Sequence, residues 1–351
     1  MSREKLIIVG VVVLGLLGAL VYRQAKTDES LGQPQTAATE LPTIHAPDDV
    51  DKLSVANGDK GEVVLERVPD PKGAATADGG VATMWTLSKP VKADANQQAV
   101  NDLVANLKDL KVDSRVNLKV DDDVRKDKQL DAAHAVHVVA WKGSDKKIDE
   151  YFGKSGAAGQ LVVVADKPDA VWAAKGYSAY LYTKESKDFR KKDILHFDDA
   201  NATQVTIANT HGALSFTKSD DKWAGTFNGK AIPRFDQEKV KDMLRAVKAL
   251  NAEDFGDGKS LADTGLDKPE AQVTFQLKDD PNAPYTLFVG GVASGTNRYA
   301  KRPDRDVVYQ LTNYVQEWVT SDATKFEAAA DAGAPAAPKA KAGKPDTGKK
   351  Q

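Results

Sequence analysis

The sequence QQAVNDLVANLKDL at residues 97–110 has a counterpart in QEKVKDMLRAVKAL at residues 237–250. Apolar side chains recur in both segments at the i, i+3, i+4, i+7 spacing of an amphipathic helix. They are Val100, Leu103, Val104, Leu107 and Leu110 in the first segment and Val240, Met243, Leu244, Val247 and Leu250 in the second. Three polar pairs also match: Gln97 with Gln237, Asp102 with Asp242, and Lys108 with Lys248. Asn96 and Asp236 stand before the segments as N-cap residues, so each segment predicts the main helix of one unit.

The flanking sequence repeats in the same order. Alternating strands are expected before the first helix at residues 53–57, at 62–68 and from Trp85, and before the second at 205–209, at 213–218 and from Trp223. After the helices they are expected at 136–141, 148–152, 161–165 and 170–173, and at 272–277, 285–289, 297–301 and 306–311. Gly153 and Gly290 are expected to close two of these strands. This order predicts an α+β protein of two tandem repeats, each an antiparallel sheet packed by one main amphipathic helix.

The chain begins with an apolar segment, LIIVGVVVLGLLGALVY at residues 6–22, that has no charge and no proline. As a helix its 17 residues would rise about 25 Å, enough for a short transmembrane span. A cleaved signal peptide is the alternative, but Leu17, Leu20, Val21 and Arg23 stand where cleavage needs small residues. We therefore expect a retained single-pass signal anchor. Basic residues flank both ends, and the short N-terminus favours a cytoplasmic start with the bulk of the chain exported.

The predicted organisation follows from these features. It consists of a cytoplasmic N-terminus (1–5), a transmembrane helix (6–22), a flexible linker (23–44), α+β repeat 1 (45–186), α+β repeat 2 (187–322) and a disordered Ala/Pro/Lys-rich tail (327–351). The expected location is the bacterial inner (cytoplasmic) membrane, with the C-terminal bulk on the periplasmic, extracytoplasmic side.

The composition argues against several classes of function. The 49 Lys and Arg residues nearly balance 51 Asp and Glu residues, and this balance does not indicate a nucleic-acid partner. Cysteine is absent, which excludes disulfides, thiolate catalysis and cysteine-bound zinc.

The histidines and acidic runs do not form a recognisable metal site. His134 and His137 are three residues apart at an expected strand entry, where they would point to opposite faces of the sheet. The acidic runs at residues 121–123, 198–199 and 220–221 do not have the spacing of a calcium loop and are typical of solvated turns. We expect no bound metal.

Two glycine-containing segments resemble nucleotide loops only superficially. Lys259-Ser260 lacks the first glycine of a phosphate loop, because Glu253 stands at that position. Residues 290–295 lack the spacing of a dinucleotide-binding loop and predict a hairpin turn. We therefore expect no cofactor, no catalytic residues and no enzymatic activity.

The tryptophans offer two interpretations. They could stack on sugars or anchor a protein interface, or they could pack inside the sheets. They are Trp85, Trp141, Trp172, Trp223 and Trp318. Trp85 and Trp223 hold equivalent places in the two repeats, which favours packing.

Several motifs stand in a recognisable order: FRKKDILHF at residues 189–197, GLDKP at 265–269, YAK at 299–301 and VVYQL at 307–311. With the tryptophan-led strand and the amphipathic helix, they resemble the bacterial domain-of-unknown-function 4340 family. The resemblance covers about residues 45–320, and the first repeat departs from it in having Leu130-Asp131-Ala132-Ala133 in place of GLDKP. It implies one N-terminal membrane helix and genes that often lie beside ABC transporter components of the gliding type. It implies no activity and no catalytic residues.

Three functions remain open at this point. The first is a membrane-anchored extracytoplasmic interaction module, an accessory subunit of a membrane complex of which an ABC transporter or gliding-type system is one candidate. The second is a cell-envelope protein that binds glycan or peptide through sheet edges or tryptophans. The third, and least favoured, is a hydrolase whose active site is dispersed along the sequence.

Overall fold

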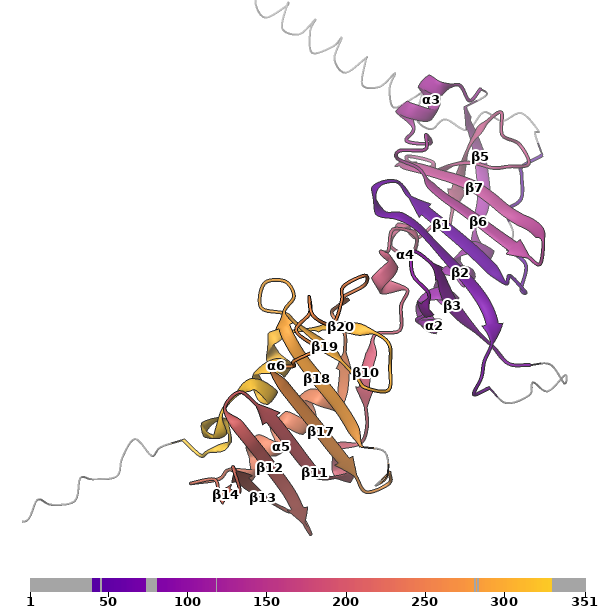
Figure 1. Ribbon diagram of the computed structural model, residues 1–351. Helices are drawn as coiled ribbons and strands as arrows, with labels where there is room; N and C mark the ends of the chain where they lie inside the picture. The colour runs from indigo at the N-terminus through magenta and orange to yellow at the C-terminus, as the bar shows by residue number, and fades with distance from the viewer. Residues whose placement is uncertain are drawn as a thin grey trace, which may run out of the picture. The chain divides into compact units, whose positions relative to one another are not determined.

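The computed structural model describes residues 40–44, 46–73, 81–117, 119–280, 282 and 284–329. The chain divides into two compact units, Met1–Lys192 and Asp193–Gln351, called unit 1 and unit 2 below (Figure 1). The predicted transmembrane helix at residues 6–22 lies outside the described residues, as do residues 23–39 of the predicted linker and residues 330–351 of the predicted tail.

Unit 1 is built on one nine-stranded antiparallel sheet with the strand order β4-β3-β2-β1-β6-β7-β8-β9-β5. Its strands are β1 (Lys52–Asn57), β2 (Gly61–Pro69), β3 (Thr83–Lys89), β4 (Ala93–Asp94), β5 (Lys111–Asn117), β6 (Val136–Lys142), β7 (Asp145–Gly156), β8 (Gly159–Val163) and β9 (Val171–Lys175). Its α-helices are α2 (Gln97–Asp109), α3 (Asp122–Asp127) and α4 (Ala179–Tyr182).

Unit 2 has a second nine-stranded antiparallel sheet, ordered β14-β13-β12-β11-β17-β18-β19-β20-β16, and a separate two-stranded pair, β10-β15. The strands are β10 (Asp193–His196), β11 (Ala202–Asn209), β12 (Gly212–Ser219), β13 (Lys222–Phe227), β14 (Lys230–Ala231), β15 (Ala249–Asn251), β16 (Asp254–Phe255), β17 (Ala271–Leu277), β18 (Tyr285–Val292), β19 (Arg298–Lys301) and β20 (Val308–Leu311). The α-helices are α5 (Gln237–Val247) and α6 (Asn313–Thr320).

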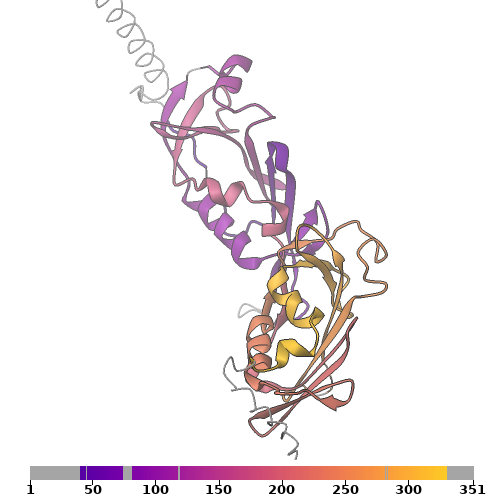
Figure 2. The same ribbon diagram turned by 90° about the vertical axis from the view of Figure 1, so that its left-hand side faces the viewer.

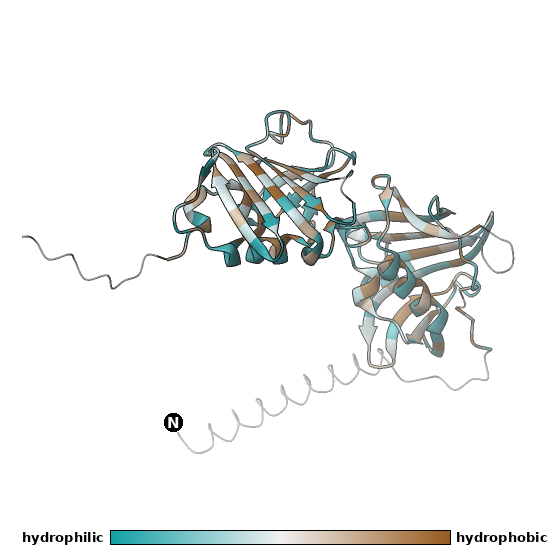
Figure 3. Ribbon diagram, turned by 90° about the horizontal axis from the view of Figure 1, so that it is seen from below, coloured by the Kyte–Doolittle hydropathy of each residue, from teal (hydrophilic) through white to brown (hydrophobic). Residues whose placement is uncertain are grey.

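The two large sheets have the same strand order when β1–β4 are matched with β11–β14, β6–β9 with β17–β20, and β5 with β16. Hydrophilic and hydrophobic residues alternate along the strands (Figure 3), as expected when one face of a sheet is packed and the other is wet. The described chain is thus mostly antiparallel sheet with few helices, as predicted from the alternating segments.

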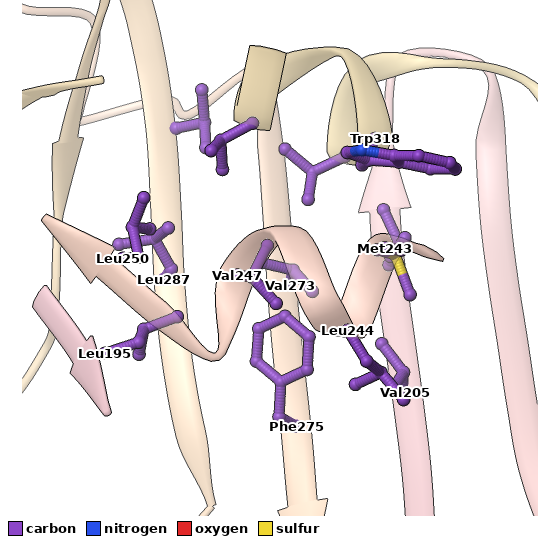
Figure 4. Close-up of a cluster of buried hydrophobic side chains, with 14 of the residues drawn as sticks. Leu195, Val205, Met243, Leu244, Val247, Leu250, Val273, Phe275, Leu287 and Trp318 are labelled. Atoms are coloured by element: carbon purple, nitrogen blue, oxygen red, sulfur yellow. The ribbon is translucent and has the colours of Figure 1, made fainter. Parts of the chain in front are cut away.

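The two predicted helices bury the apolar stripes that predicted them. Val100, Leu103 and Leu107 of α2 are fully buried in the core of unit 1. Met243, Leu244 and Val247 of α5 pack over Val205, Val273 and Phe275 of the unit 2 sheet (Figure 4). Unit 2 also has a second helix that was not predicted: α6 lies beside α5 on the same face of the sheet (Figure 2). It contributes Val315, Trp318 and Val319 to the core, so a single main helix is an incomplete description of this unit.

The polar residues that match between the two helices make matching contacts. Gln97 accepts a hydrogen bond from the Trp85 amide at 2.8 Å, and Gln237 accepts one from the Trp223 amide at 3.3 Å. Asn96 and Asp236 cap the helices through their side chains, as predicted.

A lysine near the end of each helix also has the same kind of partner in both units. Lys108 pairs with Asp48 at 2.7 Å and Lys248 with Asp199 at 3.1 Å, each aspartate lying shortly before the first strand of its sheet. The residues that repeat in the sequence therefore make the same kinds of contact around the main helix in both units.

The prediction that Gly153 and Gly290 close their strands is wrong. β7 continues to Gly156 and β18 to Val292, so both glycines lie inside a strand. At each glycine a loop crosses so closely that an added Cβ would stand 2.3 Å from a backbone oxygen, that of Lys128 or of Thr264. The next residue in each strand donates its amide to that same oxygen, at 2.9 Å and 2.8 Å. Glycine is needed here for close approach of two backbones.

Candidate functional site

The face of the unit 1 sheet opposite α2 carries a cluster of polar and aromatic side chains: Glu62, His137, Asp149 and Tyr151. We call it the open-face cluster. Leu53 and Val55 of β1 point into the core that α2 covers, so Ala56 between strands β2 and β6 faces the other way. Directly paired residues of antiparallel strands share a face. Glu62, Ala56, His137 and Tyr151 therefore form one row across β2, β1, β6 and β7.

Hydrogen bonds and stacking fix the side chains of this cluster. His137 Nε2 lies 2.6 Å from Asp149 Oδ1, and the His137 and Tyr151 rings stack with centroids 4.0 Å apart and planes 4° apart. Ser54 Oγ donates to Glu62 Oε1 at 2.7 Å. The imidazole is thus held from one side by a carboxylate and along one face by a phenol ring, which restricts its rotation.

The pKa values of Glu62 and Asp149 are both lowered in the folded protein. The hydrogen bond from Ser54 lowers the pKa of Glu62, and Lys89, 3.2 Å from Glu62 Oε2, lowers it further. Burial alone would raise the pKa of Asp149, but hydrogen bonds from His137 and Lys146 outweigh burial and leave that pKa lowered. Both carboxylates therefore carry negative charge at neutral pH.

A hollow of about 330 Å³ opens beside the row. Its lining residues are Ala56, Asn57, Gly58, Gly61, Glu62, Ala132, Ala135, His137 and Tyr151. A second hollow of about 560 Å³ adjoins it at Ala132 and Tyr151 and is lined also by Asp122, Arg125, Lys126, Leu130 and Asp131. Beyond Tyr151, Leu130 packs with Leu161, Val163 and Val171 of β8 and β9, so the segment after α3 covers that part of the face.

The matching row of unit 2 has a different chemistry. By strand register, Glu62 corresponds to Ala213, Ala56 to Ala208, His137 to Gln272 and Tyr151 to Phe288. Thr286 stands where unit 1 has Asp149, and its hydroxyl lies 3.1 Å from that of Thr274. The two sheets share a framework, and the charged row belongs to unit 1.

One further buried acid lies on the packed face of unit 1. Glu150 of β7 is 4% exposed and accepts a hydrogen bond from the Ala165 amide at 3.0 Å. Burial raises its pKa to about 7. Its side chain points away from the open-face cluster, because neighbouring strand residues alternate between faces.

A tyrosine stands exposed at the same place in each unit. Tyr180 is the second residue of α4 and Tyr314 the second residue of α6, the helices that follow β9 and β20. They are 73% and 62% exposed, and among the exposed large hydrophobic side chains of the described residues these two are the aromatic ones. Lys184 lies 4.8 Å from the centroid of the Tyr180 ring.

The histidines and acidic runs that the sequence analysis considered as metal ligands lie in separate parts of the structure. His134 lies in a turn before β6 and contacts Asp131 at 2.9 Å, whereas His137 joins Asp149. The run at residues 121–123 is not a simple loop, since Asp121 caps α3 and the next two aspartates form its first turn. The run at 198–199 caps a 3-10 turn, and that at 220–221 forms the β12–β13 turn.

The remaining sequence candidates have structural roles. Ser260 Oγ donates to Asp263 at 2.6 Å within a loop. A hairpin turn does connect β18 to β19, but it spans residues 293–297, and residues 290–292 of the predicted turn belong to β18. Trp85, Trp172, Trp223 and Trp318 are buried, which confirms packing for the equivalent pair Trp85 and Trp223. Trp141 is half-buried on the open face under Lys52.

Sequence reasoning named His137 but missed the side chains around it. Glu62 comes from β2, and Asp149 and Tyr151 come from β7, so they meet His137 of β6 only through strand register. The expected hairpins give the registers of β1 with β2 and of β6 with β7, but the row also needs the pairing of β1 with β6, which lie far apart in the sequence. Tyr180 and Tyr314 stand in helices that follow the last alternating segment of each unit, where the strand period has ended.

No group of three or more His, Asp or Glu residues in the described ranges is arranged to hold a metal ion. Among residues 40–329, where they are described, no helix is both long and apolar enough to cross a bilayer.

A family model described as "Domain of unknown function (DUF4340)" matches residues 85–269 and 236–329. The two matches reach from the tryptophan-led strand β3 of unit 1 to the end of the described chain, and both include α5. Searches of curated proteins and of solved structures each found no match. With 85–329 of 351 residues covered, the chain belongs to the DUF4340 family.

Proposed function

We propose that this chain is a membrane-anchored, extracytoplasmic interaction module without enzymatic activity, an accessory subunit of a membrane complex. The observation that carries the proposal is the exposed tyrosine at the same position of α4 and α6. A large exposed aromatic ring leaves apolar surface in contact with water, and a partner that covers the ring removes this unfavourable contact. Tyrosine is therefore enriched at protein interfaces.

Two further features support the proposal. The apolar segment at residues 6–22 has the composition of a transmembrane anchor. In each unit, residues matched in the repeat, such as Gln97 and Lys108, hold the main helix to the sheet. These residues therefore stabilise the fold, and other surface residues are available to bind a partner. An ABC transporter or a gliding-type system is the candidate complex, on the strength of the family resemblance alone.

The test is purification of the full chain from its native membrane in a mild detergent. We expect a transporter permease to co-purify in a fixed ratio, and we expect the double variant Y180A/Y314A to lose it. The matched control is V81A/V292A, which truncates exposed apolar side chains of 67% and 61% exposure, one in each unit. A wild-type chain that elutes alone, or equal loss of the permease in both double variants, would contradict the proposal.

A second candidate function is binding of a small cell-envelope ligand or peptide. The hollow beside the open-face cluster favours it, because the hollow is concave and has few, well-positioned polar groups. Tyr180 and Tyr314 do not line this hollow, so the two functions can be separated experimentally.

A further inference from the structure

The hollow of unit 1 has a floor and two walls of distinct character. Ala56 provides the floor, because it is the smallest side chain in the row and stands between Glu62 and His137. One face of the imidazole is covered by Tyr151, so the other face is turned toward Ala56. A group resting on Ala56 would therefore lie between a carboxylate and the flat face of a ring.

The fixed charge inside the hollow is negative. Among the described side chains that line it, Glu62 is the carboxylate, and its lowered pKa leaves it charged at neutral pH. Lys89 and Lys146, which pair with Glu62 and Asp149, are not lining residues. Among the described residues, Ser54 donates to one carboxylate oxygen of Glu62 and Lys89 to the other, and a carboxylate oxygen can accept more than one hydrogen bond. A donor entering over Ala56 can still bind there.

The small lining residues, the carboxylate of Glu62 and the ring of His137 together favour a flat or slender cationic group as the ligand. A guanidinium is planar, stacks on aromatic faces and donates in a fork that fits a carboxylate. An alkyl ammonium makes the same charge contact without the stacking. The open sides of the hollow are formed by Gly58, Gly61, Ala132 and Ala135, none of which has a side chain larger than a methyl group.

We propose that this hollow binds an organic cation, a guanidinium or alkyl-ammonium group held between Glu62 and the ring of His137 over Ala56. The adjoining hollow is lined by Asp131, Arg125 and Lys126 among others, and it accommodates the part of the ligand that extends from the cationic group past Ala132. The matching row of unit 2 has Ala213 and Gln272 instead, so the site belongs to unit 1. The proposal is independent of the interaction through Tyr180 and Tyr314.

The first experiment is calorimetric titration of the detergent-purified full chain with arginine amide, lysine amide and citrulline amide, each acetylated at its α-amino group so that the side chain carries the only charge. Citrulline amide has a neutral urea in place of the guanidinium and serves as the matched ligand control. We expect both cations to bind and citrulline amide to bind at least tenfold more weakly, since charge-assisted hydrogen bonds carry the contact. Absence of binding by every cation tested, including the peptides below, would overturn the proposal.

Variants then locate the site. We expect Glu62→Gln to weaken arginine amide binding about tenfold or more. We expect Ala56→Leu to abolish it by filling the floor, and His137→Phe to retain more of it than His137→Ala because the ring face remains. The control is Glu66→Gln on the same strand and face, where Glu66 pairs with Lys52 at 3.0 Å outside the hollow. Equal weakening by Glu62→Gln and Glu66→Gln would overturn the site assignment.

A second set of titrations distinguishes a cationic side chain of a peptide from a small free amine. Pentapeptides with a central arginine are compared with their citrulline analogues and with arginine amide. Tighter binding of the arginine peptide identifies a peptide ligand that extends into the adjoining hollow, whereas equal binding identifies a small amine. Near-ultraviolet circular dichroism of each variant checks that the fold is intact. These titrations leave the tyrosine-dependent co-purification untouched, so failure of one proposal does not imply failure of the other.

Discussion

At the scale of single residues, Gly153 and Gly290 explain why two strands approach a loop so closely. We expect Gly290→Ala to destabilise unit 2 by about 2 kcal/mol, because its Cβ would collide with the backbone oxygen of Thr264. Gly153→Ala should act similarly on unit 1 through Lys128. The measurement is urea unfolding followed by tryptophan fluorescence.

The chain supplies a neighbouring control for this prediction. At Gly291 an added Cβ would lie 3.6 Å from the same Thr264 oxygen, an ordinary contact. Gly291→Ala should therefore cost much less than Gly290→Ala. Equal losses at the two positions would show that close approach is not the reason for the glycine.

Glu150 gives unit 1 a pH dependence of defined sign. Its pKa is raised from 4.5 to about 7 by burial, so between these values the folded state keeps a proton that the unfolded state has released. Stability from this group is therefore highest below about pH 4.5 and falls as the pH rises toward 7. Glu150→Gln should make unit 1 more stable at pH 8, by about 2 kcal/mol, with little gain at pH 5. Urea unfolding at both pH values, with exposed Glu253→Gln as the control, checks this; an equal gain at pH 5 and pH 8 would refute it.

At the scale of elements, the end of α6 is held by a side chain from the sheet. Asn209 at the end of β11 donates to the carbonyls of Val319 and Ser321 at 3.0 Å and 2.8 Å. The matching residue of unit 1, Asn57, has a buried Nδ2 with no hydrogen-bond partner in the described structure. The same residue type therefore contributes differently in the two units.

We expect Asn209→Ala to destabilise unit 2 by about 2 kcal/mol through the loss of these bonds. Asn57→Ala should be neutral or slightly stabilising, since no bond is lost and a buried polar atom is removed. Hydrogen exchange of the α6 amides should also rise in Asn209→Ala. Comparable destabilisation by the two alanine variants would show that the α6 contact is not what Asn209 provides.

The elements that the sequence predicted are those with a strong apolar period. The stripes of α2 and α5 and the alternation of residues 272–277 lead directly to buried positions such as Leu103, Leu244 and Phe275. β5 was missed because its sequence, KVDSRVN, has charged residues inside the strand and two register shifts against β9. β16 has two residues, too few to show a period. Tertiary pairing, which local sequence does not reveal, defines such edges.

At the scale of the whole molecule, each unit has its own core. The large cluster of unit 2 draws on residues from Ile194 to Phe326, and that of unit 1 on residues from Ile44 to Phe189. We therefore expect a fragment of residues 193–329 to fold on its own with a single cooperative urea transition. Strong binding of a hydrophobic dye and a gradual, non-cooperative loss of circular dichroism would argue against separate folding.

The candidate site was less predictable than the fold. The repeat identified the framework residues because both units keep them, as Gln97 and Gln237 show. The open-face row differs between the units, so the repeat offered no signal for Glu62 or Asp149. Surface positions that depart from a repeated framework become visible only once strand register is known.

Site-specific photocrosslinking in intact cells tests the interaction role most directly. A photoreactive phenylalanine analogue is placed at Tyr180, at Tyr314 and, as a control, at exposed Val81. If the chain is an accessory subunit of a membrane complex, positions 180 and 314 should each give a discrete crosslink to the same transporter permease, and position 81 should give none. Absence of that crosslink at both tyrosine positions, or equal crosslinking at position 81, would contradict the account.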